Sequence, residues 1–255
     1  MNNSAKNLQR ISLGILSHVL FVVVWHFAVV LGDIPEFILP TPLAALESLS
    51  EPNYNWLHHT WVTTLEIFGG YTSALIFGVG VALIFTWVPI IKAAFMPLFV
   101  TINMIPKVAM APLFIVWLSY GIVPNIIIGF TICFFPILLT TVRGLNEVEP
   151  DLIDLVRALR GSRWQIFVKI QLPGSLPYIF SGMKVAAVLA VAGAIVGEFI
   201  ASDAGLGYFL MIAQENLDTA AMVMALIFIS LVGMILYALV LALETLVVTK
   251  DARVE

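Results

Sequence analysis

The apolar residues of this chain run in blocks of about twenty, and this pattern restricts the fold more than any other feature. A helix of about 20 apolar residues crosses the hydrocarbon core of a bilayer. Only 11% of the residues are charged, compared with about 25% in a typical soluble protein. We therefore expect an all-α membrane protein with residues 1–255 in a single transmembrane domain. The blocks predict six spans, at residues 12–32, 62–88, 93–118, 124–142, 176–199 and 221–248.

Lysine and arginine are distributed unevenly between the predicted spans. Segments 33–60, 119–123 and 200–220 contain neither, whereas ten of the twelve basic residues lie in the terminal segments, at Lys92 and in segment 143–173. Basic residues accumulate in the cytoplasmic loops of membrane proteins. The distribution predicts that both termini and segment 143–173 face the cytoplasm.

Segment 143–173 is a long polar connection that carries five of the twelve basic residues. Pro150 and the acidic residues around it favour the start of a helix, and Gly161 is expected to end that helix. Apolar residues recur between them at helical spacing, at Leu152, Leu155, Val156 and Leu159. The sequence therefore predicts a short amphipathic helix on the cytoplasmic side.

A second short helix is expected after a tight turn. Ser162 followed by Gln165 is typical of a capping box at a helix start. Trp164, Phe167 and Ile170 would form its apolar stripe, and Pro173 is expected to stop it. Two amphipathic helices outside the membrane indicate a surface that binds a partner.

The triplet Asp154-Leu155-Val156 and the run Ile170-Gln171-Leu172-Pro173 lie in this segment at a characteristic separation. They resemble the cytoplasmic "EAA" loop in the membrane subunits of binding-protein-dependent ABC importers, which reads Glu-Ala-Ala, three residues, Gly, nine residues, Ile-x-Leu-Pro. Two positions depart from that pattern. Asp154 replaces the glutamate, and Arg160 occupies the position of the motif glycine, one residue before Gly161.

Three further stretches are similar to the nitrate, sulfonate and taurine permease group, whose relatives also import thiamine-precursor pyrimidines and riboflavin. They are Leu39-Pro40-Thr41-Pro42, the run from Ile105 to Leu113, and Gly205-Leu206-Gly207-Tyr208. The resemblance covers about residues 35–245. It implies a type I ABC importer permease fold in a bacterial plasma (inner) membrane, and import of a small polar or anionic solute. A pyrimidine or riboflavin cargo is the alternative.

The resemblance also implies partners. Two copies of an ATPase would bind ATP and Mg, a second permease chain would complete a homodimer, and a periplasmic or surface-tethered binding protein would deliver the solute among membrane lipids. Coupling to the ATPase would rest on Asp154, Leu155, Val156, Arg157, Leu159, Arg160, Gly161 and Ser162.

No catalytic signature is present in the sequence. The phosphate-loop pattern G-x-x-x-x-G-K-[ST] is missing, and no Ser-His-acid or paired-carboxylate arrangement is evident. We expect no enzymatic activity, bound cofactor, metal or nucleic acid in this chain. An ATPase-independent transporter or channel is the alternative, and segment 143–173 argues against it, as does the lack of an obvious inverted repeat.

Charged residues inside the predicted spans are candidates for the translocation path, because they are costly in lipid. Lys107 lies about 11–14 residues from either end of the third span, too deep for its side chain to reach an interface. We place it on the path with Asn103 and Met104; an internal ion pair or a differently placed span is the alternative. Lys184 could reach partly towards the inner interface. Glu198, near the outer end of the fifth span, could line an outer gate or lie exposed at the rim of the helix bundle. The same two alternatives apply to Glu66 in the second span.

Small residues form a stripe along the fifth span that lets helix backbones approach closely, either inside the bundle or at a subunit interface. They are Gly182, Ala186, Ala190, Gly193 and Gly197. Segment 201–220 is expected outside, with a short helix over 208–217. By resemblance, the binding protein would deliver cargo there; a plain connector is the alternative.

Overall fold

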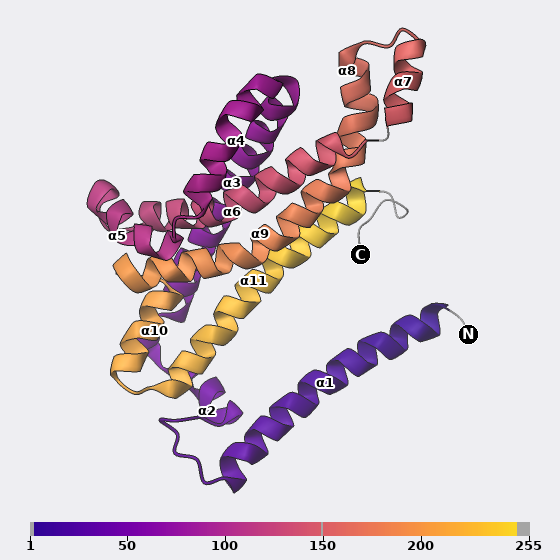
Figure 1. Ribbon diagram of the computed structural model, residues 1–255. Helices are drawn as coiled ribbons and strands as arrows, with labels where there is room; N and C mark the ends of the chain where they lie inside the picture. Colours follow the sequence, from indigo (N-terminus) through magenta and orange to yellow (C-terminus); the bar gives the residue numbers. More distant parts are fainter. Residues whose placement is uncertain (1–2, 149, 249–255) are drawn as a thin grey trace. The chain divides into compact units, whose positions relative to one another are not determined.

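The computed structural model describes residues 3–148 and 150–248, and every regular element within these residues is helical (Figure 1). Contacts divide the chain into two compact units. Unit 1 comprises Met1–Trp56 and Phe209–Phe228, and unit 2 comprises Leu57–Tyr208 and Ile229–Glu255. The all-α class predicted from the apolar blocks is confirmed.

Five helices are long and apolar enough to cross a membrane, and a bent pair of helices supplies a sixth candidate if it is counted as one span. Each predicted span except the third corresponds to one continuous helix. The helices are α1 (Asn3–Leu31), α3 (Trp56–Trp87), the pair α4 (Pro89–Asn103) and α5 (Lys107–Leu118), α6 (Ile122–Asn146), α9 (Leu172–Ala201) and α11 (Thr219–Val247).

The third predicted span, 93–118, is wrong as a straight helix. Helices α4 and α5 are bent by 96° at the break between them. The change of direction is visible in Figure 1. Pro106 has no N–H for the helix ladder, and it disfavours the helical conformation at Ile105. Its own ψ of 113° is extended. The break therefore places Lys107 at the first residue of α5 instead of at the middle of a span.

Unit 1 contains α1, α2 (Pro42–Glu47), two short turns η1 (Ser48–Ser50) and η2 (Pro52–Tyr54), and most of α10 (Leu206–Glu215). The Trp25 indole donates a hydrogen bond of 3.0 Å to the carbonyl of Pro40. The Tyr54 hydroxyl donates to the carboxylate of Asp218. Helix α10 confirms the short helix expected in segment 201–220.

Within unit 2, α6 packs closely along α9. A Cβ built on Gly193 of α9 would lie 2.9 Å from the Cα of Gly129 on α6. A Cβ on Gly70 of α3 would lie 3.1 Å from the same Cα atom. The predicted small-residue stripe therefore packs inside the bundle, where it lets three backbones meet.

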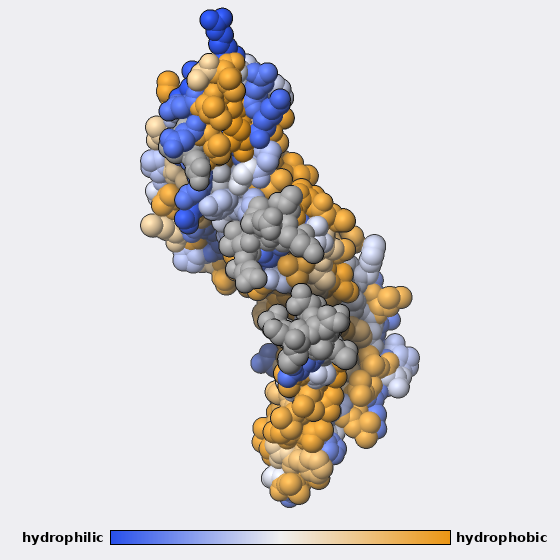
Figure 2. Space-filling model, turned by 90° about the vertical axis from the view of Figure 1, so that its right-hand side faces the viewer, coloured by the Kyte–Doolittle hydropathy of each residue, from blue (hydrophilic) through white to orange (hydrophobic). Residues whose placement is uncertain are grey.

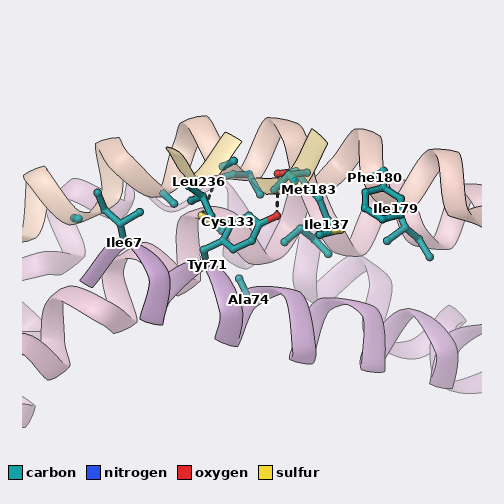
Figure 3. Packing of buried hydrophobic residues seen from close by; sticks show 14 of the residues in the cluster. Ile67, Tyr71, Ala74, Cys133, Ile137, Ile179, Phe180, Met183 and Leu236 are labelled. Atoms are coloured by element: carbon teal, nitrogen blue, oxygen red, sulfur yellow. Dashed lines mark hydrogen bonds between the residues drawn. The ribbon is translucent and has the colours of Figure 1, made fainter. Parts of the chain in front are cut away.

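The apolar core of unit 2 surrounds Tyr71 of α3 (Figure 3). Its hydroxyl donates a hydrogen bond of 3.3 Å to the carbonyl of Met183, so the one polar atom of the side chain is satisfied at 5% exposure. The neighbouring side chains come from α3, α6, α9 and α11, and include Ile67, Ala74, Cys133, Ile137 and Leu236.

The polar segment forms a helical hairpin of α7 (Pro150–Ala158) and α8 (Arg163–Ile166). The expected stop at Pro173 is wrong, because α8 continues through the π-helical segment η3 (Phe167–Gln171) into α9 (Figure 1). A proline ring clashes with the carbonyl four residues earlier in a regular α-helix. The wider π turn just before Pro173 displaces that carbonyl, so the helix continues.

The glycine contact predicts a difference between two alanine substitutions. Gly193→Ala should lower the stability of the protein in detergent by about 1–3 kcal/mol, because its Cβ overpacks the α6 backbone. Gly80→Ala on α3 is the control, since a Cβ there meets nothing within 4 Å; it should be neutral or stabilise by up to about 1 kcal/mol. Thermal unfolding measures both, and equal melting temperatures for the two variants would contradict the packing role of Gly193.

Candidate functional site

The turn between α7 and α8 is a Schellman motif that reverses the chain in three residues. The Gly161 N–H donates to the carbonyl of Val156 at 2.8 Å, and the Arg160 N–H donates to the carbonyl of Arg157 at 2.9 Å. Arg160 is the left-handed residue, with a φ of 58°. Arginine thus adopts the conformation for which helix ends usually use glycine, at the position where the resemblance expects one.

Gly161 is needed for a different reason. Its φ is not positive, but a Cβ there would lie 2.3 Å from Val156 Cγ1 and 2.9 Å from the Val156 carbonyl oxygen. The chain returns so closely over the end of α7 that no side chain fits. The first helix therefore ends before Gly161, as predicted, through the combined requirements of two adjacent residues.

The capping box that begins α8 is confirmed. The Ser162 N–H donates to Gln165 Oε1 at 2.7 Å, and the Gln165 N–H donates to Ser162 Oγ at 3.3 Å. At the end of α3, Trp87 packs edge-to-face against Phe167 and at a tilt against Trp164, with ring centroids 5.3 and 6.0 Å away. Sequence reasoning did not connect Trp87 with this hairpin, because only the fold brings the end of α3 to it.

One face of the hairpin, along α7, is apolar and exposed to solvent. Leu155 and Leu159 are 57% and 74% exposed, and Leu152 is also exposed. Asp154 forms an exposed ion pair with Arg157 at 3.1 Å, a contact of the kind that adds little stability. Figure 2 shows hydrophilic side chains around an apolar strip at this end of unit 2. A rigid hairpin with such a face is suited to binding another protein.

Lys107 caps the carboxyl end of α4. Its ammonium donates to the carbonyls of Ile102, Asn103 and Ile105 at 3.2, 2.7 and 3.1 Å, where helix carbonyls lack partners and the dipole favours a cation. The ion-pair alternative is wrong within the described residues, where the salt bridges do not include Lys107.

Lys107 and Asn103 line one cavity of about 190 Å³, whose walls are mostly apolar. Met104 does not line it and is 78% exposed. The cavity therefore brings together two of the five path candidates. Its other lining residues are Phe99, Ile102, Met110, Phe130, Thr131, Phe134 and Phe135.

Lys184 and Glu198 lie elsewhere in unit 2. Lys184 pairs at 3.1 Å with Glu244, near the carboxyl end of α11; its reach towards the inner interface stays a prediction. Glu198 is 1% exposed, which excludes the exposed-rim alternative. Its carboxylate accepts hydrogen bonds from the Thr63 hydroxyl and the Gly207 N–H. Glu66 is also 1% exposed, so the rim alternative is wrong for it too.

The chain is similar to membrane components of known transport systems. Residues 74–248 match the family described as "Binding-protein-dependent transport system inner membrane component". The riboflavin transport system permease protein RibX of Chloroflexus aurantiacus is 32% identical over 97% of this chain and 94% of its own. The formylaminopyrimidine transport permease protein ThiX of Halalkalibacterium halodurans is 27% identical over 91% and 92%. Relatives named for nitrate, bicarbonate and aliphatic sulfonate transport also match.

Among solved structures, an inward-facing conformation of the MetNI methionine ABC transporter matches with a TM-score of 0.61 at 18% identity. The match covers 75% of this chain and 98% of that one. At this identity the likeness concerns the fold.

The hairpin turn predicts opposite effects at adjacent positions. Arg160→Gly should stabilise the protein by up to about 1 kcal/mol, since glycine adopts a positive φ without steric strain. Gly161→Ala should destabilise it by about 1–3 kcal/mol through overpacking against Val156. Thermal unfolding of the purified variants tests this pair, and destabilisation by Arg160→Gly would show that the arginine side chain makes contacts that outweigh the strain.

Proposed function

This chain belongs to the family of binding-protein-dependent transport system inner membrane components, and we propose that its α7–α8 hairpin couples a separate ATPase to the passage of an aromatic heterocyclic solute. The chain is the permease subunit of an ABC importer for small solutes. In this family ATP hydrolysis takes place on a separate ATPase subunit. The exposed leucine face of α7 is the observation that carries the coupling proposal.

The working complex in this proposal has two permease chains, two ATPase chains and a binding protein outside. Both termini and the hairpin face the cytoplasm, in agreement with the distribution of basic residues. ATP binding closes the ATPase pair and moves the hairpin. Because α8, η3 and α9 form one helical run from Arg163 to Ile200, that motion passes directly into a span that packs against α6. Rigid-body switching of this kind alternates access between the two sides.

The residues that line the Lys107 cavity favour a planar aromatic solute as the cargo. Four phenylalanines supply faces for stacking, and Asn103 and Thr131 supply hydrogen-bonding groups. The Lys107 ammonium is already occupied by three carbonyls, so the cavity has no uncommitted cation for a small anion. The relatives named for riboflavin and formylaminopyrimidine, which match over most of this chain, agree with this choice. The small polar or anionic solute expected from the sequence is the alternative.

The coupling proposal predicts the effect of charging the leucine face. Leu155→Asp should abolish co-purification of the ATPase and ATP-driven uptake while leaving the melting temperature of the permease nearly unchanged, because the side chain is 57% exposed. Leu217→Asp is the control for ATPase co-purification, since this leucine is 66% exposed in the loop expected outside. Assembly and transport at wild-type levels in Leu155→Asp would rule out docking through this face.

The path proposal predicts a cargo and a variant effect. Proteoliposomes with the ATPase and binding protein should take up a labelled flavin or pyrimidine in preference to nitrate or a sulfonate. Lys107→Ala should lower that uptake about tenfold, a loss of about 1.4 kcal/mol, with the ATPase still bound, because the three carbonyls at the end of α4 beside the cavity lose their donor. Lys92→Ala is the matched control at the start of α4. Uptake of nitrate or sulfonate alone would replace the cargo proposal with the anionic alternative.

A further inference from the structure

Two carboxyl groups meet inside unit 2. Glu66 of α3 and Glu198 of α9 are each 1% exposed, and their side chains are within hydrogen-bonding reach of each other. Two ionised carboxylates in contact in a buried site repel strongly and lose their hydration. A pair in this position is therefore expected to hold one proton.

The hydrogen-bond donors identify Glu198 as the ionised member. The Thr63 hydroxyl donates to Oε1 at 2.5 Å, the Gly207 N–H donates to Oε2, and the Tyr208 N–H also points at this carboxylate. These N–H groups belong to the first turn of α10, where the helix dipole favours an anion. The Thr63 hydroxyl in turn accepts from the Leu206 N–H at 2.7 Å.

Glu66 has the opposite surroundings. Its Oε1 accepts from the Asn125 amide at 2.8 Å, whereas its Oε2 is buried and has no partner among the described atoms. An unpartnered carboxyl oxygen beside a carboxylate is satisfied when it carries a proton, since it then donates to its neighbour. The proton therefore belongs on Glu66.

We propose that Glu66 and Glu198 form a proton-binding site that holds the turn at residues 205–207 against α3 and α9. Glu66 retains the proton and donates it in a hydrogen bond to the Glu198 carboxylate, which in turn caps α10. Loss of the proton to bulk water leaves two adjacent anions, and their repulsion releases the turn.

The turn is shaped around this carboxylate. A Cβ on Gly205, whose φ is 114°, would lie 2.3 Å from Glu198 Cδ, and one on Gly207 would lie 2.8 Å from Oε2. Further titratable groups at the turn are His59, whose Nδ1 accepts from the Gly205 N–H at 3.1 Å, Tyr208, whose ring lies 6.1 Å from that of His59, and the exposed Asp203. Ser202 completes the cluster by accepting from the Asn125 amide at 2.6 Å.

The proposal predicts how stability depends on pH. The folded chain holds a proton that an exposed glutamate releases at neutral pH, so stability is full at lower pH and falls as pH rises. The folded-to-unfolded ratio decreases by up to about tenfold per pH unit for one such proton. Glu66→Gln should remove this decrease, because the amide reproduces the neutral acid by donating to Glu198 and accepting from Asn125.

The test uses thermal unfolding of the full-length chain in detergent from mildly acidic to alkaline pH, with infrared spectroscopy of the same samples. Glu66→Gln should match the wild type at mildly acidic pH, exceed it increasingly as pH rises, and lack at neutral pH the carbonyl band of a protonated carboxylic acid. Glu198→Gln should be destabilised throughout, because its amide meets N–H donors. Asp203→Asn is the control and should keep the wild-type pH dependence. A wild type without this band, or a Glu66→Gln variant as unstable as Glu198→Gln at neutral pH, would overturn the proposal.

Discussion

Backbone contact between α6 and α9 is the interaction on which the remainder of unit 2 depends. Lipid is as apolar as a leucine side chain, so helices in a bilayer associate through close packing and interhelical hydrogen bonds. Gly129 and Gly193 provide that packing where the two backbones meet, and Gly70 brings α3 to the same place. Helix α5, which begins with Lys107, packs against both α6 and α9. The hairpin continues into α9, and the carboxyl pair lies on α3 and α9.

The charged groups within the spans of unit 2 differ in the kind of partner that satisfies them. Lys184 has an oppositely charged partner in Glu244. Lys107 uses backbone carbonyls that the break at Pro106 leaves without helical partners. Glu198 takes donors from a helix start, and its neighbour Glu66 is accommodated as a neutral acid in our proposal. An intramembrane charge therefore indicates a structural or functional site only when its partners are known.

The hairpin joins the exposed leucine face of α7 to α9 without a flexible linker. Helix α7 ends in a strained but fully hydrogen-bonded turn at Arg160, and α8 begins with a complete capping box. The π-helical segment then lets the chain pass Pro173 without losing its helical direction. A force applied to the exposed leucines of α7 consequently reaches α9, and through it the contact with α6.

Sequence alone determined the helical class, the position of most spans and both helix starts in the hairpin, because these depend on apolar run length and on groups a few residues apart. It could not determine the break before Lys107, since a proline within an apolar run either kinks a span or ends it. It also predicted a helix stop at Pro173, where the helix continues, and it could not identify the partners of Lys184 and Glu198. Their surroundings come from residues far apart in the chain: Glu244 is 60 positions from Lys184, and Thr63 is 135 from Glu198. Only tertiary packing decides which buried charges meet, because the partner of a charge in a low-dielectric interior is set by geometry across helices.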